Sequence, residues 1–268
     1  MNITEAIMQR RSVRTYTGAA LDDETAAKIV EYAAGLKAPF GAKCRIEMIR
    51  AAGGDKPVKL GTYGFIKGAS DYLALIVGDG PLAEEGAAYV FEQAVLYCTS
   101  LGLGTCWLGG SFSRGSFSKQ LTLAPDEKLR IVSPVGTASD KRHLSLISIF
   151  SSSAPKPRKP FTANFFRDRF GIPLSETEAG VYARPLEMVR MAPSANNKQP
   201  WRVVLDGQML HFYKSASFGF DSIDLGIALC HFELTCREMG ISGGFEVRND
   251  APEGHKATYV ISWMPENR

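Results

Sequence analysis

The sequence predicts an α+β protein made of two related halves, each a mixed sheet covered by helices. Strand-like and helix-like segments alternate along the chain, a pattern that packs helices against sheets. Residues 151–160, Ser-Ser-Ser-Ala-Pro-Lys-Pro-Arg-Lys-Pro, form a solvated connector. Short segments recur in the same order on both sides of this connector. We therefore expect one half at 1–150 and the other at 161–268.

The first half begins with a helix that Asn2 and Glu5 would cap reciprocally. A second helix is expected to start at Asp22 or Asp23, because apolar residues follow at helical spacing. The later elements are strands near 46–50, 72–77 and 130–135 and a long helix at about 84–101.

The second half shows a similar alternation. A helix is expected near 184–191, followed by a hairpin whose strands, 202–205 and 210–213, turn at Asp206-Gly207. The remaining elements are a helix at about 222–239 and a strand at 257–263.

Two pairs of segments carry the repeat. Leu96–Gly104 and Leu234–Ser242 share leucine, cysteine and glycine in step near the end of a helix. Ala38–Cys44 and Ala192–Lys198 each follow a helix and precede an apolar run. Similarity by chance over such short stretches is the alternative to an internal duplication.

Bulk properties exclude several classes of protein. The 31 basic and 28 acidic residues leave a net charge of +3, too small an excess for a typical nucleic-acid binder. No segment approaches the roughly 20 apolar residues of a membrane span, and the N-terminus lacks the features of a signal peptide. The 5 cysteines include no C-x-x-C pair, so we expect reduced thiols in a cytoplasmic protein.

The first candidate segment for ligand binding is Gln9–Tyr16. Its arginines, at 10, 11 and 14, offer fixed donors that keep their charge, and Ser12 adds a hydroxyl. Such a segment can cradle an anion. Taken alone, it is better explained as the solvated basic end of a helix.

The second candidate segment is Met191–Trp201. Pro193 and Pro200 fix its backbone, and its Ser, Asn and Gln side chains could read the polar edge of a heterocycle. A simple connecting turn would explain the Asn and Pro residues, but it does not require Gln199 and Trp201.

Two further segments follow the long helix of the first half. Gly109-Gly110 comes after an apolar run and would let the backbone approach a planar ligand, although a plain loop is the alternative. Gly102 is expected to cap the helix rather than to form a dinucleotide fingerprint. Ser139–His143 adds two cations, Lys141 and Arg142, which could equally be surface charge.

The sequence shows neither a Ser/His/Asp triad nor a metal-binding cluster, so no catalytic side chain and no metal is expected. His231 lies among apolar helix residues and is expected to be a core histidine. Cys98 and Cys236 occupy matching helical positions, which favours core packing for both.

Together these segments resemble the nitroreductase family of FMN enzymes. That family combines an Arg-Arg/His-Ser-x-Arg/Lys motif, a Pro-Ser-x-x-Asn-x-Gln-Pro-Trp motif, a helix ending in Ser-Leu-Gly-Leu-Gly before Trp-Ile/Leu-Gly-Gly, and a later Lys/Arg pair. The matching segments here are Arg10–Arg14, Ala192–Trp201, Ser100–Gly110 and Lys141-Arg142.

The order of the motifs departs from the family. The Pro-Ser-x-x-Asn motif normally comes early, but here its early counterpart, Ala38–Cys44, has lost the Ser, Asn and Gln. Family members are homodimers whose FMN sites combine the arginine motif of one subunit with the Pro-Ser-x-x-Asn motif of the other. The resemblance therefore implies a nitroreductase-like fold in which two fused copies form an intrachain pseudo-dimer with one FMN. Fusion makes a monomer sufficient without forbidding a homodimer.

The resemblance also implies roles for individual residues. Arg10, Ser12 and Arg142 would hold the FMN phosphate with help from Lys141, and Arg14 would lie near the N1–O2 edge of the flavin. Gly109 or Gly110 would direct a backbone N–H to N5, and Thr62 or Tyr63 would approach the pyrimidine edge. The implied cofactor-binding residues are Arg10, Arg11, Ser12, Arg14, Gly109, Gly110, Lys141, Arg142, Pro193, Ser194, Ala195, Asn197 and Gln199.

The implied function is an oxidoreductase in which NAD(P)H reduces FMN and a small electron-poor acceptor then replaces the nicotinamide. The acceptor could be a nitroaromatic, a quinone or a flavin. One alternative is an FMN-binding protein for storage or sensing without significant turnover. Another is an interaction protein that binds no flavin, which would leave the co-occurrence of the motifs unexplained.

Overall fold

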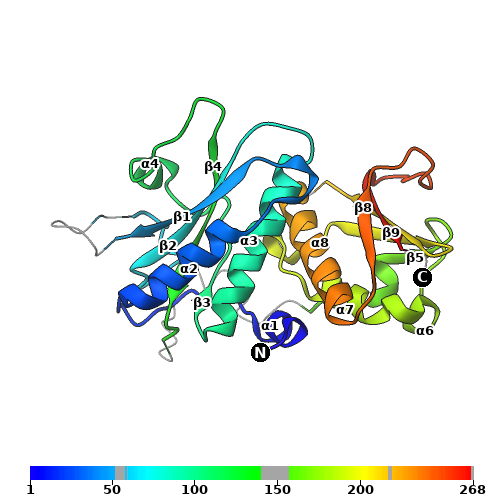
Figure 1. Cartoon of the computed structure of the whole chain (residues 1–268), viewed down its shortest axis with the longest axis horizontal. Coiled ribbons are helices and arrows are strands. Elements are labelled where there is room, and N and C mark those ends of the chain that lie inside the picture. The colour runs from blue at the N-terminus through cyan, green and yellow to red at the C-terminus, as the bar shows by residue number, and fades with distance from the viewer. Residues whose placement is uncertain (52–57, 59, 140–156, 217–218, 267–268) are drawn as a thin grey trace. The chain divides into compact units, whose positions relative to one another are not determined.

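The computed structural model describes residues 1–51, 58, 60–139, 157–216 and 219–266. Its chain divides into two compact units, each containing one sheet (Figure 1). The first unit comprises Met1 and Gln9–Pro155, and the second comprises Asn2–Met8 and Lys156–Arg268. Both are mixtures of helices and strands, as the sequence predicts for an α+β fold.

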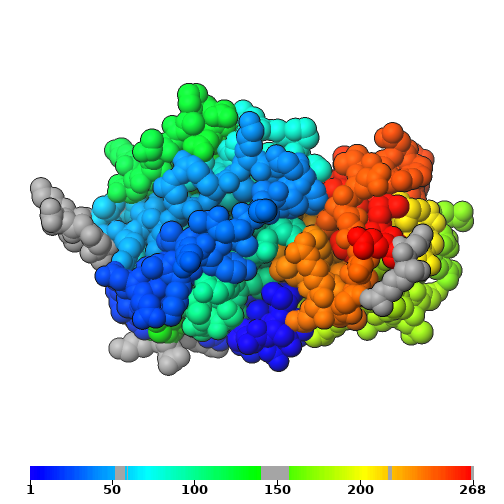
Figure 2. Space-filling model, in the orientation of Figure 1, coloured from blue at the N-terminus to red at the C-terminus, as the bar shows by residue number. Residues whose placement is uncertain are grey.

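Helix α1 (Ile3–Gln9) belongs mainly to the second unit, although its residues come first in the chain. The backbone N–H groups of Ile3 and Thr4 donate to the carboxylate of Glu238, at 2.6 and 3.3 Å. Figure 2 shows the dark-blue atoms of α1 beside the orange end of the helix that carries Glu238. The predicted cap is confirmed, because the Asn2 N–H donates to Glu5 and the Glu5 N–H to Asn2.

The sheet of the first unit has the strand order β1-β2-β4-β3, with antiparallel pairing throughout. Strand β2 is buried at every position, which explains its continuous apolar sequence. The strands are β1 (Cys44–Arg50), β2 (Asp71–Val77), β3 (Gly104–Thr105) and β4 (Lys128–Gly136). The helices are α2 (Asp23–Gly35), the 3₁₀ turn η1 (Pro39–Gly41), α3 (Ala83–Ser100) and α4 (Arg114–Ser118).

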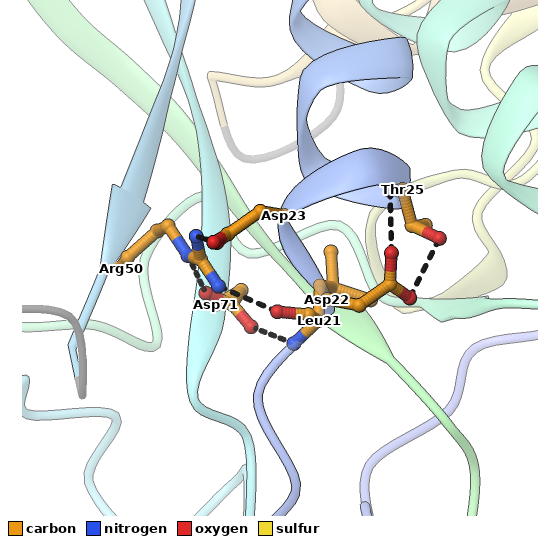
Figure 3. Close-up of polar contacts among 6 residues, drawn as sticks. All are labelled: Leu21, Asp22, Asp23, Thr25, Arg50 and Asp71. Carbon is orange, nitrogen blue, oxygen red and sulfur yellow. Dashed lines mark hydrogen bonds and ion pairs between the residues drawn. The ribbon is translucent and has the colours of Figure 1, made fainter.

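A buried carboxylate ties the start of α2 to this sheet (Figure 3). Asp71 is 1% exposed and accepts the Leu21 N–H at 2.7 Å and the Arg50 Nε–H at 3.2 Å. Arg50 also donates to the Leu21 carbonyl and to Asp23, each at 2.5 Å. Asp22 caps α2 through the Thr25 N–H, which confirms the predicted start of that helix.

The sheet of the second unit has the order β5-β6-β7-β9-β8. Its strands are β5 (Phe165–Arg167), β6 (Trp201–Asp206), β7 (Met209–Lys214), β8 (Gly243–Glu246) and β9 (Thr258–Pro265). The β6–β7 hairpin is confirmed, but its two-residue turn is Gly207-Gln208, because Asp206 pairs with Met209. The helical segments are η2 (Phe161–Ala163), α6 (Glu176–Ala179), η3 (Gly180–Tyr182), α7 (Ala183–Met191), η4 (Ala195–Asn197) and α8 (Asp221–Glu238).

Helices α3 and α8 end in the same hydrogen-bond pattern. The Leu103 N–H donates to the Cys98 carbonyl, and the Ile241 N–H donates to the Cys236 carbonyl, both at 2.9 Å. The glycine that follows each helix is left-handed: Gly102 after α3 has a φ of 77°, and Gly240 after α8 has a φ of 69°. This pattern is the Schellman cap, and it confirms Gly102 as a helix cap. The two helices therefore end in the same way, and the internal duplication itself stays a prediction.

The loops after α2 and α7 are also equivalent, in a register that the sequence does not show. Each contains a 3₁₀ turn with consecutive left-handed residues: Phe40-Gly41 at φ 62° and 68°, and Asn196-Asn197 at φ 52° and 57°. This backbone pattern matches the two loops in a register that differs from the alignment of Ala38–Cys44 with Ala192–Lys198. Backbone conformation matches Pro39 to Ala195, whereas the sequence pairs Pro39 with Pro193.

Gly86 in α3 should resist substitution, although alanine normally favours a helix. A Cβ added to Gly86 would lie 2.5 Å from the Ala42 Cβ and 2.7 Å from the Pro39 carbonyl oxygen. Gly86→Ala should therefore lower the free energy of unfolding by about 1–2 kcal/mol, since overpacking outweighs the helix preference of about 1 kcal/mol. Urea denaturation measures this change.

Gly115 in α4 provides the matched control, because nothing lies within 4 Å of its added Cβ. Gly115→Ala should stabilise the protein by about 0.5–1 kcal/mol. If both substitutions stabilised the protein equally, the loop that contains Pro39 and Ala42 would not be in close contact with α3 at Gly86.

Candidate functional site

The arginine motif forms an extended segment within the first unit. The Val13 N–H donates to the Thr105 carbonyl at 2.8 Å, and Tyr16 and Arg14 exchange backbone hydrogen bonds with Lys67 at 2.9 Å. Val13 and Tyr16 are buried and anchor the segment in the core. Arg11, Ser12 and Arg14 are exposed by comparison, so the segment presents donors outward from a fixed backbone.

Arg10 has an unsatisfied donor. Its Nε atom is buried and has no hydrogen-bond partner among the described residues. A buried donor on a charged group without a partner is costly, which indicates that an acceptor belongs there. An anionic oxygen is the acceptor that a guanidinium binds most strongly.

A buried thiol marks the place where the donors of this motif meet. Burial raises the pKa of Cys106, which is 3% exposed, while the charge of Arg14, a hydrogen bond from Ser12 and the charge of Arg10 oppose the rise. The structure therefore brings Arg10, Ser12 and Arg14 together around one side chain. The sequence gives no signal for this role of Cys106, because a single cysteine between Thr105 and Trp107 also fits an ordinary core position.

The Gly109-Gly110 segment follows Leu108, which pairs with Val132 of β4. Neither glycine has a positive φ, and an added Cβ at Gly110 would meet nothing within 4 Å. Backbone conformation and packing thus leave glycine unexplained at position 110. The space beside the chain there is open, and the expected approach of a flat ligand stays a prediction. The Trp107 Nε1–H anchors the segment on Glu92 of α3 at 2.8 Å.

The Ala192–Trp201 segment forms a left-handed loop in the second unit. Asn196, Asn197 and Gln199 all have positive φ, which is strained for residues other than glycine. Ser194 holds the loop closed, because its hydroxyl accepts the Gln199 N–H at 2.9 Å. Pro193, Ser194 and Ala195 remain partly exposed.

Residues 157–159 hold the two amide side chains of this loop. Asn197 accepts from Arg158 at 2.7 Å and donates to the Pro157 carbonyl at 3.2 Å. Gln199, which is 1% exposed, accepts the Lys159 N–H at 2.9 Å. These contacts give both amides structural partners. The sequence does not reveal these contacts, because the composition of residues 151–160 indicates only a connector.

The structure thus assembles two subsets of the expected residues, one in each unit. Lys141 and Arg142 lie outside the described residues. Thr62 is buried and bonded to the Ile66 carbonyl at 3.3 Å, while Tyr63 is 63% exposed with φ of 47°. Both precede Lys67, so their turn leads directly into the residue that pairs with the arginine segment.

The histidine and cysteines assigned to the core lie there. His231 is fully buried, with Nδ1 2.9 Å from the Met188 carbonyl oxygen, and Cys98 and Cys236 are fully buried. Within the described ranges, no group of three or more His, Cys, Asp or Glu side chains could hold a metal ion. In the same part of the chain, no helix is long and apolar enough to cross a membrane.

Known structures share this fold. A structure described as a "putative nitroreductase" of Thermotoga maritima is 23% identical and has a TM-score of 0.60, covering 98% of this chain and 93% of its own. An "oxidoreductase containing FMN" is 20% identical with a TM-score of 0.52, covering 62% of this chain and 92% of its own. Among curated proteins, none matches the chain.

The fold is accordingly that of the nitroreductases. The sequence matches the family described as "Putative TM nitroreductase" over residues 2–236, which is most of the chain. The resemblance seen in the motifs is thereby confirmed, and the chain belongs to this nitroreductase family.

Proposed function

We propose that the protein is an FMN-dependent oxidoreductase that takes a hydride from NAD(P)H and reduces a small electron-poor acceptor. Membership of a nitroreductase family and the FMN of one structural neighbour support a flavin oxidoreductase. The observation that carries the proposal is the buried, unpartnered Nε of Arg10, placed with Ser12 and Arg14. This donor set fits the doubly charged phosphate of FMN.

Arg10 and Ser12 would bind the phosphate, with Lys141 and Arg142 adding charge. Arg11, which is exposed, would contribute through its positive charge. Arg14 would stabilise the negative charge that a reduced flavin carries at its N1–O2 edge. A backbone N–H of Gly109 or Gly110 would face N5, where the open space at Gly110 admits a ring.

The second half would contribute its Ala192–Trp201 loop to the same FMN. Pro193, Ser194, Ala195, Asn197 and Gln199 would border the flavin ring or the ribityl chain. When bound, FMN supplies the ability to accept a hydride at N5 and to pass it on. We expect one FMN per chain, because the loop that matches this one in the first half lacks the polar side chains.

The chain's own residues would position the flavin and exclude water from it, and they would not exchange protons with the substrate. The rigid backbone of the arginine segment fixes the donors, since Val13, Arg14 and Tyr16 are all bonded to neighbouring backbone. A flavin reaction by hydride exchange needs an open face for nicotinamide and then for the acceptor. Nitroaromatics, quinones and free flavins are the acceptors to test.

A flavin-binding protein without significant turnover is the second candidate. It is favoured by the contacts of Asn197 and Gln199 with residues 157–159, which leave fewer free groups for substrate. Rapid bleaching of bound FMN by NADH or NADPH under anaerobic conditions would exclude this candidate.

The deciding experiment is an absorbance spectrum of the purified protein with its flavin-to-chain ratio, followed by titration with FMN. We expect a flavin spectrum, a ratio near one, and anaerobic reduction by NADH or NADPH that an added quinone or nitroaromatic reverses. A colourless protein that does not take up added FMN would overturn the proposal.

A further inference from the structure

Asp224 is a buried carboxylate held against the candidate flavin loop. It lies in the first turn of α8, is 3% exposed, and accepts the Ala195 N–H with both oxygens, at 3.0 and 3.1 Å. Burial raises its pKa to about 7; the Ala195 N–H opposes this rise and the charge of Asp221 adds to it. Lys214 of β7 reaches the same turn of α8 by donating to Ser222 at 2.5 Å.

The first half shows what the same position looks like without a polar loop. Because α3 and α8 have equivalent ends and are both 18 residues long, Gly86 of α3 matches Asp224 of α8. Gly86 faces the Pro39 carbonyl and Ala42, and Pro39 matches Ala195. Proline has no N–H to donate. The first half therefore has neither the carboxylate acceptor nor the N–H donor at these two positions.

This difference between the halves distinguishes two possible roles of Asp224: positioning the loop for a ligand, and stabilising the fold. The loop of the first half keeps its left-handed pair although glycine, Gly86, stands at the position of Asp224, so a carboxylate at that position is not needed to form the turn. A buried carboxylate is also unfavourable for stability: with its pKa raised above that of the unfolded chain, it costs stability as the pH rises toward 7. Of the two matching positions, only the one beside the polar loop has a carboxylate. This indicates that the carboxylate serves ligand binding by that loop.

We propose that Asp224 is the positioning residue that fixes Ala195, and with it the adjacent Ser194 and the nearby Asn197, in the arrangement that binds FMN. The inference rests on the proposed function. Anchoring the Ala195 N–H fixes the backbone immediately before two left-handed residues, Asn196 and Asn197, where a rotation would redirect their side chains. The ionised carboxylate is the stronger acceptor, so FMN binding depends on the charge of Asp224.

FMN fluorescence titrations from pH 5.5 to 8.5 test the proposal, using wild type, Asp224→Asn, Asp224→Ala and the control Asp221→Asn. At pH 8, both Asp224 variants should bind FMN about tenfold more weakly, whereas the control should stay within about twofold. Wild-type affinity should also rise through pH 7 beyond the rise that Asp224→Asn shows, since titration of the FMN phosphate is common to both.

Stability distinguishes positioning from a structural defect. Asp224→Asn removes a buried charge, so above pH 7 it should unfold at an equal or higher urea concentration than wild type while binding FMN less well. Asp224→Asn binding FMN within twofold of wild type at every pH overturns the role of Asp224 and leaves the proposed function standing. Failure of wild type to bind FMN overturns both.

Discussion

Replacing Arg10 with alanine should weaken FMN binding by about 10- to 150-fold, because a hydrogen bond to a charged partner contributes about 1.5–3 kcal/mol. The reason lies in the buried Nε, which has no protein partner among the described residues and is free for a phosphate oxygen. Equilibrium dialysis or fluorescence titration with FMN measures the loss. Added salt should weaken wild type more than the variant, since the variant has lost one of the charges that attract the phosphate.

Two matched controls locate the site. Arg184→Ala removes an exposed arginine of α7 and should leave FMN affinity unchanged. Phe40→Ala alters the counterpart loop of the first half and should affect stability alone. If Phe40→Ala abolished FMN binding while Arg10→Ala did not, the flavin would belong to the other combination of motifs.

Replacing Asp71 with alanine should lower the free energy of unfolding by about 2–3 kcal/mol, because it leaves a buried N–H unsatisfied and removes one partner of Arg50, whose side chain is 32% exposed. The change strands the buried Leu21 N–H and leaves the guanidinium of Arg50 without its buried carboxylate (Figure 3). Urea denaturation followed by circular dichroism provides the measurement.

Asp23→Ala is the control, since it also removes a carboxylate bonded to Arg50. Asp23 has a side chain that is 94% exposed, so its loss should cost at most about 1 kcal/mol. Equal losses for the two variants would mean that burial does not distinguish the two contacts.

Elements with strong local signals could be predicted from the sequence. The caps at Asn2, Asp22 and Gly102 are chemical signals confined to a few residues, and all three are confirmed. Strand β2 is predicted by its unbroken apolar run, Tyr72–Val77. By contrast, β3 has 2 residues and β5 has 3, too few for any periodicity, and β8 is Gly-Gly-Phe-Glu, which reads as a turn.

The candidate site also contains parts that the sequence predicts and parts that it does not. The arginine, glycine and proline motifs indicate its segments only as a set, because each motif taken alone has an ordinary structural explanation. Asp224 could not be found in this way, since its partner is a backbone N–H far away in sequence. The register of the repeat was also hidden: it is carried by backbone angles at Phe40 and Asn196, residues with no chemical likeness.

The bonds between α1 and Glu238 make the second unit discontinuous along the chain. Residues 2–8 belong to a unit whose other residues begin at Lys156, and the residues of the first unit stand between them in the sequence. A single cut of the chain therefore cannot separate the two units, because α1 would remain attached to the residues of the first. A fragment that starts at Lys156 would lack the two backbone donors that the carboxylate of Glu238 accepts.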